Sequence, residues 1–312
     1  MIRCLCPSPS VDVTYQVERL LRGATTRVRA VTRRAGGKAV NVARVVHSAG
    51  SGALVVAAVG GPAGTEFAAD LAAEGIEHSL VPAAPTTRCT VTVVEDDGSA
   101  SVLTEHASLG AGWPRLAALA VEALTARDVL VVSGSMPNDV APDALTALVA
   151  DGRGTGSSVV VDTSGPPLLA ALAAAPTLVA PNRDELAEVT GDGDPERAAT
   201  ALARRFDTVV VASLGPVGVL AATPERVWTA RPPEQLTGNP TGAGDALVAG
   251  IALHLAGDAV RDDPAGWLPA ALREGVALSA AAVLVPYAGA VDVDYAARVR
   301  PLVEVDQLEP AR

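Results

Sequence analysis

The 312-residue chain contains a single lysine, Lys38, although lysine and arginine together number 24. Aromatic residues make up only 3% of the chain while 49% of its residues are hydrophobic, so the core must rest on alanine, valine and leucine. The formal net charge of −11 argues against nucleic acid or an anionic membrane surface as the main partner. An anionic small molecule stays possible, because a local basic pocket is enough to bind one.

Cysteine is also scarce, with Cys4, Cys6 and Cys89 only. Cys4 and Cys6 fall two residues apart in an apparent strand, so their side chains face the same way. That spacing suits neither a zinc site nor a redox pair, and we interpret both as buried structural thiols in a reducing cytoplasm. The sequence shows no secretory leader pattern and no apolar run long enough to span a bilayer. We therefore expect a soluble, cytoplasmic protein.

Short, continuous apolar runs rich in valine recur along the chain, and they indicate strands buried on both faces of a sheet. Amphipathic segments rich in alanine and leucine lie between them and indicate helices. This alternation predicts an α/β fold with a doubly wound, mostly parallel sheet and helices on both faces. The predicted strands are 53–59, 129–132, 159–161, 177–180 and 208–211, and the predicted helices are 114–124, 141–150, 166–174 and 195–205.

Two stretches, 11–31 and 89–103, instead alternate polar and apolar residues. This pattern is typical of half-exposed antiparallel strands. We expect them to form a small β-sheet lid inserted in one α/β domain that spans residues 1–312.

Polar residues follow four of the predicted strands: Ser133, Asp162, Asn182 and Ser213. In an α/β sheet of this kind, ligands bind outside the carboxyl ends of the strands. Each residue taken alone is more simply a cap for the next helix. Together they favour a binding site at one edge of the sheet.

The segment from Thr241 to Asp245 reads Thr-Gly-Ala-Gly-Asp and opens an apolar stretch. Small residues allow a ligand close to the backbone, and a helix start there would aim free N–H groups at an anion. A carboxylate in such a place would repel a phosphate unless it accepts a proton from an attacking hydroxyl. The alternative is a plain helix start with an acidic residue favoured by the helix dipole.

A second glycine segment, Gly36-Gly37-Lys38, precedes another apolar stretch. Helix N–H groups and an ammonium would together form an anion site. A glycine turn with a solvated lysine is the alternative, but the rarity of lysine in this chain argues against an incidental one.

Two further segments are less specific. Asn182 and Glu185 lie three residues apart at a predicted helix start, where they could hold Mg²⁺ through water or form a capping box, or both. Gly215 and Gly218 follow a strand and would let the backbone approach a nucleotide. The chain contains no P-loop motif, no nucleophile-elbow motif and no histidine pair with metal-ligand spacing.

These segments, in this order, resemble the ribokinase-like (PfkB-type) carbohydrate kinases over nearly the whole chain. The likeness is greatest to members that phosphorylate sugar phosphates, such as 1-phosphofructokinase and tagatose-6-phosphate kinase. It rests on Gly36-Gly37-Lys38 with Asn41, Ser133-Gly134, Asp162-Thr163, Asn182 with Glu185, Ser213 with Gly215 and Gly218, and Gly242-Ala243-Gly244-Asp245. The opening Pro7-Ser8-Pro9-Ser10-Val11-Asp12 and the pair Thr87-Arg88 strengthen it.

The resemblance implies ATP and Mg²⁺ as cofactors, a sugar phosphate as substrate, and a homodimer formed through the lid. Fructose 1-phosphate is the expected acceptor, and its product would be fructose 1,6-bisphosphate. The roles that the resemblance implies are: Asp245 as base; Gly242, Ala243 and Gly244 as anion hole; Asp12, Gly37, Asn41 and Ser133 at the sugar; Lys38 and Arg88 on its phosphate; Asn182, Ser213, Gly215 and Gly218 at the nucleotide; and Glu185 near the metal.

Three positions depart from the family pattern. Ala180 stands where a lysine near the ATP phosphates is common, Ala39 replaces a glycine, and Asn239 replaces an aspartate tied to monovalent-cation effects. Tagatose 6-phosphate, fructose 6-phosphate, an unphosphorylated sugar or a nucleoside remain alternative acceptors. A catalytically weak sensor of sugar phosphate or nucleotide, on the same fold, is the alternative from a different class.

Overall fold

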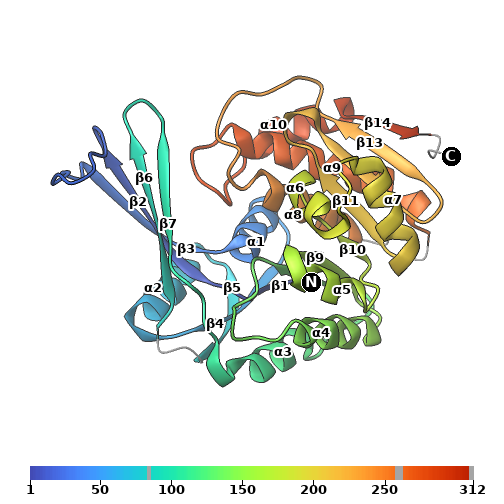
Figure 1. Ribbon diagram of the computed structural model, residues 1–312, viewed down its shortest axis with the longest axis horizontal. Helices are drawn as coiled ribbons and strands as arrows, with labels where there is room; N and C mark the ends of the chain where they lie inside the picture. Colours follow the sequence, from blue (N-terminus) through green and yellow to red (C-terminus); the bar gives the residue numbers. More distant parts are fainter. Residues whose placement is uncertain (83–85, 257–262, 309–312) are drawn as a thin grey trace.

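The computed structural model describes residues 1–82, 86–256 and 263–308, which form two β-sheets with helices around the larger one (Figure 1). The larger sheet has ten strands in the order β14-β13-β12-β11-β10-β9-β8-β1-β4-β5. Its strands from β5 to β11 pair in parallel, whereas β12, β13 and β14 extend it in antiparallel fashion. The parallel strands are β5 (Glu77–Pro82), β4 (Ala53–Val59), β1 (Ile2–Cys6), β8 (Val129–Ser133), β9 (Ser158–Asp162), β10 (Leu178–Val179) and β11 (Val209–Ser213).

The sheet is doubly wound, as predicted, because successive side chains of its strands enter different core clusters. Cys4 and Cys6 of β1 belong to one cluster and Leu5 to the other. The first cluster includes residues of α1 (Lys38–Ser48), α2 (Gly61–Ala73), α8 (Ala243–Leu255), α9 (Pro264–Val283) and α10 (Val293–Val299). The second includes residues of α3 (Trp113–Val121), α4 (Asp143–Gly154), α5 (Gly165–Leu172), α6 (Arg183–Thr190) and α7 (Pro195–Phe206).

The prediction of buried thiols is confirmed, since Cys4 and Cys6 are buried and neither forms a disulfide. The predicted strand 53–59 coincides with β4, and the other predicted strands and helices match described elements within a few residues. The antiparallel strands β12 (Val219–Ala222), β13 (Val227–Arg231) and β14 (Glu304–Leu308) were not predicted. The described residues also include the short 3₁₀ helices η1 (Gly110–Gly112), η2 (Gly215–Val217) and η3 (Arg300–Leu302).

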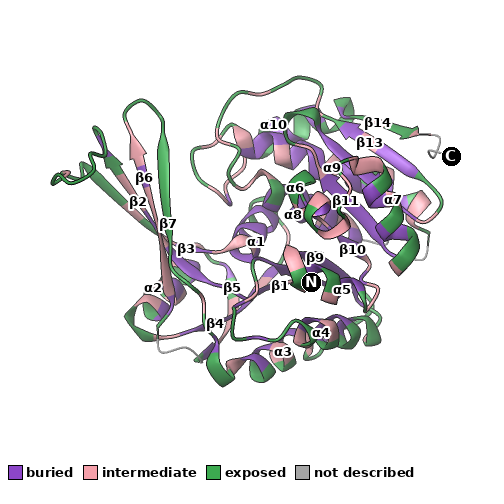
Figure 2. Ribbon diagram, viewed as in Figure 1, coloured by how far each residue is buried: buried purple, intermediate pink, exposed green. Residues whose placement is uncertain are grey.

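The smaller sheet projects from the body at the left of Figure 1, in the order β3-β2-β6-β7. Its outer parts are largely exposed, in contrast to the buried central strands of the large sheet (Figure 2). The strands are β2 (Ser10–Val17), β3 (Ala30–Gly36), β6 (Arg88–Glu95) and β7 (Ala100–Thr104).

The expected antiparallel pairing holds for β2 with β3 and for β6 with β7, but it is wrong for the central pair of the lid. There β2 and β6 run parallel. The reason is that β2 follows β1 and β6 follows β5, and both of those lie in the parallel part of the large sheet. Two strands that leave a parallel sheet at the same edge continue in the same direction.

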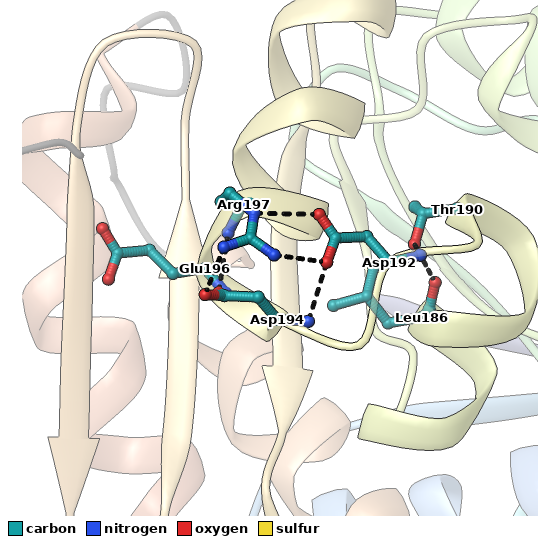
Figure 3. Close-up of polar contacts among 6 residues, drawn as sticks. All are labelled: Leu186, Thr190, Asp192, Asp194, Glu196 and Arg197. Carbon is teal, nitrogen blue, oxygen red and sulfur yellow. Dashed lines mark hydrogen bonds and ion pairs between the residues drawn. The ribbon is translucent and has the colours of Figure 1, made fainter. Parts of the chain in front are cut away.

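A polar turn fixes the connection between α6 and α7 (Figure 3). Asp194 caps α7 by accepting from the backbone N–H groups of Glu196 and Arg197, and Arg197 binds the carboxylates of Asp192 and Asp194. The Thr190 hydroxyl donates to the Leu186 carbonyl oxygen at the end of α6. This turn anchors the C-terminal end of α6, and the first turn of α6 lies at the carboxyl edge of the large sheet. No helix in the described part of the chain combines the length and hydropathy needed to cross a membrane.

Candidate active site

The carboxyl edge of the large sheet brings together the polar residues that follow its strands. Ser133 pairs with Asp162 at the ends of β8 and β9, and an isolated bridge joins Asn182 to Ser213. A cavity of about 380 Å³ opens at this edge. It is lined by Lys38, Asn41, Asp162, Ala180, Asn182, Glu185, Ser213, Thr241, Gly242, Gly244, Asp245 and Leu247.

The first turn of α8 forms one wall of this cavity. Gly242 caps the helix with φ of 86°, and a Cβ there would lie 2.9 Å from the Ala288 Cα, so only glycine fits. The backbone N–H groups of a first helical turn have no partner within the helix, which suits them to an anion. Gly242, Gly244 and Asp245 line the cavity, while Ala243 faces a neighbouring one.

Asp245 is a buried carboxyl group held by Asn41 of α1, whose Nδ2 donates to its Oδ2 at 2.8 Å. Burial raises the pKa of Asp245 to about 7, and the negative charge of Asp162 adds to the rise. The hydrogen bond from Asn41 and the charge of Lys38 act in the opposite direction. A carboxylate with such a pKa can accept a proton near neutral pH.

The first turn of α1 lines the same cavity through Lys38 and Asn41. Its cap, Gly37, has φ of 110°, and a Cβ there would lie 2.6 Å from the Cys6 Sγ. A Cβ on Gly36 would overlap the carboxyl group of Asp12, so the glycine allows that carboxyl group to lie against the backbone. Ala39 is helical, which is the backbone conformation that tolerates its methyl group.

Lys38 extends from this turn into the cavity. Its Nζ lies 3.1 Å from Oδ1 of Asp162, and the Ser133 hydroxyl donates to the other oxygen of Asp162 at 2.7 Å. Burial lowers the pKa of Lys38, but the charges of Asp162, Glu185 and Asp245 outweigh it and the net shift is upward. Sequence reasoning gave Asp162 no role in the site, although it noted the residue in the family resemblance and as a strand exit. That position was the signal that it belongs to the site.

Asp12 and Arg88 lie at the base of the lid. The Asp12 carboxylate accepts from the Ser10 hydroxyl at 2.6 Å, and burial raises its pKa. The Arg88 guanidinium donates to the carbonyl oxygens of Ser8 and Glu105, at 3.2 and 3.1 Å. Arg88 lines a small separate hollow, so Lys38 and Arg88 do not meet in one cavity in this structure. Their shared role at a substrate phosphate stays a prediction.

The capping box at the start of α6 is present. Asn182 Oδ1 accepts from the N–H groups of Asp184 and Glu185, and Glu185 Oε2 accepts from the N–H of Asn182. Within the described residues, no group of three His, Cys, Asp or Glu side chains is placed to hold a metal ion. Mg²⁺ that also binds phosphates needs only one or two protein carboxylates, and Glu185 lines the cavity with only its Oε2 in the capping box. Glu185 therefore fits such an ion.

A second cavity, of about 460 Å³, adjoins the first and shares Ser213, Gly244 and Leu247 with it. Gly215, Gly218, Leu236 and Val283 contribute to its lining. Gly218 has φ of 109°, and a Cβ there would lie 2.3 Å from the Ala230 carbonyl oxygen. This pocket suits the apolar part of a ligand whose anionic part reaches α8.

One contributor to the site was missed by sequence reasoning: the loop of residues 286–290, which buttresses both helix starts. Asn239 Nδ2 donates to the Pro286 carbonyl oxygen at 2.9 Å. Ala288 packs against Gly242, and Gly289 approaches Asn41 so closely that a Cβ would lie 2.9 Å from its Oδ1. Nothing in the local sequence of the loop signals these contacts.

Known proteins resemble this chain both in sequence and in fold. The family model of pfkB family carbohydrate kinases matches residues 8–294. A 1-phosphofructokinase from Xanthomonas campestris is 37% identical over 265 residues, covering 81% of this chain and 83% of its own. The 1-phosphofructokinase of Escherichia coli is 31% identical over 254 residues, covering 78% and 80%.

Solved structures agree with this relationship. Phosphofructokinase-2 from E. coli, in complex with potassium, superimposes with a TM-score of 0.89 at 28% identity, covering 96% of this chain and 98% of its own. The ribokinase of Arabidopsis thaliana shares the fold, with a TM-score of 0.71 at 18% identity over 96% and 98% of the two chains. The chain therefore belongs to the pfkB family of carbohydrate kinases.

Proposed function

We propose that this kinase transfers the γ-phosphoryl group of ATP to a hydroxyl of a phosphorylated ketohexose, with fructose 1-phosphate as the acceptor and fructose 1,6-bisphosphate as the product. The observation that carries the proposal is the buried Asp245 carboxyl group beside the first turn of α8. The names of the two 1-phosphofructokinases support the choice of acceptor.

In the transfer step the acceptor hydroxyl oxygen attacks the γ-phosphorus. A new O–P bond forms, the bond from phosphorus to the β–γ bridging oxygen breaks, and ADP leaves with that electron pair. The hydroxyl proton passes to Asp245, whose pKa near 7 suits a base at neutral pH. The N–H groups of the Gly242–Gly244 turn stabilise the negative charge of the phosphoryl group in flight.

We place the nucleotide across the two adjoining cavities, with its base in the pocket of Gly215 and Gly218 and its phosphates beside Asn182 and Ser213. Glu185, which lines the first cavity, would hold Mg²⁺ through water. When bound, the ion neutralises phosphate charge and orients the phosphates for transfer.

The acceptor lies between the body and the lid in this proposal. Asp12 and Asn41 hold its hydroxyl groups, with Gly37 and Ser133 beside them, and Arg88 supplies positive charge for its phosphate. Closure of the lid would exclude water, which otherwise competes with the sugar hydroxyl for the phosphoryl group. The three free cysteines fit a reducing compartment, and we propose a cytoplasmic location.

A panel of acceptors tests the proposal. ADP formation is measured with ATP, Mg²⁺ and one of fructose 1-phosphate, fructose 6-phosphate, tagatose 6-phosphate, fructose or a nucleoside. We expect the highest kcat/KM with fructose 1-phosphate. A preference for an unphosphorylated acceptor would contradict the assignment, and binding without turnover for all of them would favour a sensor.

Asp245→Asn is the matched variant, and it should lower kcat by a factor on the order of 10²–10⁴, the usual contribution of a positioned base. Burial raises the pKa of this carboxyl group, so its ionised form destabilises the fold as pH rises toward and through 7. The variant should consequently be at least as stable as the parent at pH 8, and thermal unfolding checks this. Retained turnover would remove Asp245 from the role of base.

Fructose 6-phosphate is the second candidate acceptor, for a specific reason. A structure of E. coli phosphofructokinase-2 in complex with fructose 6-phosphate superimposes with a TM-score of 0.87 at 28% identity. The same panel decides between the two, because the position of the phosphate on the sugar is all that differs between them.

A further inference from the structure

Lys38 is the only basic side chain among the described residues that line the first cavity, the one at the start of α8. Three carboxylates, those of Asp162, Glu185 and Asp245, line it with Lys38, and all three raise the pKa of its ammonium group. A phosphoryl group entering this cavity would therefore meet three carboxyl groups and one ammonium group. Without the ammonium, the side chains alone would oppose its entry.

The ammonium group is fixed on one side and free on the other. Its Nζ lies 3.1 Å from Oδ1 of Asp162, which is buried and held in turn by the Ser133 hydroxyl at 2.7 Å. The Lys38 side chain is 43% exposed, so it keeps an accessible surface toward the cavity. An ammonium group has three donors, and Asp162 uses one of them.

The position of Lys38 relative to the anion hole is set by the two helices. Lys38 lies in the first turn of α1, and Gly242 and Gly244 lie at the first turn of α8. Asn41 of α1 donates a hydrogen bond to Asp245 of α8, which joins these two helices directly. Lys38 and the first-turn residues of α8 thus line the same cavity. Arg88 lines a separate hollow and contacts the carbonyl oxygens of Ser8 and Glu105.

We propose that Lys38 contacts the phosphoryl group that is being transferred, rather than the phosphate that the acceptor already carries, and that Asp162 and Ser133 hold it in place. The inference rests on the proposed phosphoryl transfer at Asp245 and refines the role that sequence comparison gave to Lys38. It leaves Arg88 as the cation for the acceptor phosphate. Ala180 lines the same cavity without a charge, which leaves the task to Lys38.

Steady-state kinetics distinguish contact of Lys38 with the transferred phosphoryl group from contact with the acceptor phosphate. Lys38→Met should lower kcat by a factor on the order of 10²–10³, as expected for loss of a group that stabilises the transition state, with the KM for the sugar phosphate changed less than about threefold. Arg88→Met is the matched control and should raise that KM while kcat is largely kept. A Lys38→Met enzyme with normal kcat and a strongly raised sugar-phosphate KM would overturn the proposal.

A rescue variant tests the location of the charge. Because Ala180 lines the same cavity, Ala180→Lys in the Lys38→Met background returns an ammonium group to the transfer site from another strand end. We expect the kcat of this double variant to be about tenfold or more above that of Lys38→Met alone. Ala180→Met in the same background should not raise kcat. Absence of rescue together with normal nucleotide binding would count against a role in transfer.

Nucleotide binding supplies a readout that does not depend on the acceptor. Lys38→Met should weaken binding of the non-hydrolysable ATP analogue AMP-PNP by about tenfold or more and that of ADP by less than about twofold, because only the former carries a γ-phosphate. Equal affinities of parent and variant for AMP-PNP would overturn the inference. If the parent phosphorylates no sugar but the AMP-PNP difference persists, the acceptor assignment fails and the role of Lys38 stands.

Discussion

The carboxyl group of Asp245 is subject to opposing influences that set its pKa. Burial and the charge of Asp162 favour the protonated form, whereas the hydrogen bond from Asn41 and the charge of Lys38 favour the ionised form. The balance places the pKa at about 7. The proposed base is consequently about half ionised near pH 7 and more fully ionised above it, so its protonation state should be visible in the rate.

We expect kcat/KM to rise with pH through about 7 and then level off, because the acid form of Asp245 cannot accept a proton. Asn41→Ala removes the donor to the carboxylate, so the rise should move to higher pH by roughly one to two units. Thr190→Ala, which removes a donor to the Leu186 carbonyl oxygen at the end of α6, is the control and should leave the midpoint unchanged. An unshifted midpoint in Asn41→Ala would assign the titration to another group.

The elements at the site are held by two loops rather than by the helices alone. Asn239 Oδ1 accepts from the Thr241 N–H at 3.0 Å, and its Nδ2 donates to the Pro286 carbonyl oxygen at 2.9 Å. The same two loops meet where Ala288 packs against Gly242. One side chain therefore links the turn that opens α8 to the loop that covers it.

Asn239→Ala removes both hydrogen bonds and should loosen the first turn of α8. We expect kcat to fall by about tenfold, the equivalent of roughly 1.4 kcal/mol, because the anion hole is no longer held for the transition state. Asn239→Asp keeps the acceptor for Thr241 but turns a carboxylate toward the Pro286 carbonyl, so it separates the two contacts. Steady-state kinetics measure the effect, and Asn138→Ala, at an exposed asparagine that lines neither cavity, is the control. Equal kcat in all three variants would show that the loops hold α8 without Asn239.

Sequence patterns predicted those elements whose signal is local. The run 53–59 is apolar throughout and became β4, and the glycines at Gly37 and Gly242 marked the starts of α1 and α8. Strands β12 to β14 were not predicted because they are short, pair in antiparallel fashion and lie at the edge of a sheet that the sequence otherwise indicates to be parallel. The contacts between site residues were not predicted for another reason. Lys38 meets Asp162 across 124 residues and Asn41 meets Asp245 across 204, and no local pattern encodes such pairs.

The parallel pairing of β2 with β6 gives the lid two chemically different faces. One face carries Asp12, Thr14, Arg34, Thr90 and Thr92, which are paired across the strands. Arg34 lies 5.9 Å from the centre of the Tyr287 ring, so this polar face turns toward the loop that covers the site. The opposite face carries Val13, Tyr15, Val31, Val91, Val93 and Leu103.

Only part of the apolar face is covered within one chain. Val13 and Val93 are buried, but Val31 and Leu103 are 54% and 60% exposed. Exposed apolar side chains on a sheet that carries the proposed substrate residues on its other face fit a lid-to-lid contact between two copies of the chain. We propose that the enzyme is a homodimer joined in this way, so that assembly and acceptor binding depend on the same small sheet.

Leu103→Glu tests this arrangement, because a dimer contact would bury its charge without a partner. We expect the parent to have twice the chain mass of 31.4 kDa by light scattering and the variant to have the mass of one chain. The variant should also show a raised acceptor KM, since Asp12 and Arg88 lie on strands of the same sheet. Leu302→Glu, at a leucine 59% exposed on η3, is the matched control and should change neither property. A parent of single-chain mass, or a Leu103→Glu variant that stays a dimer, would place the lid outside the interface and leave Val31 and Leu103 as solvent-facing residues.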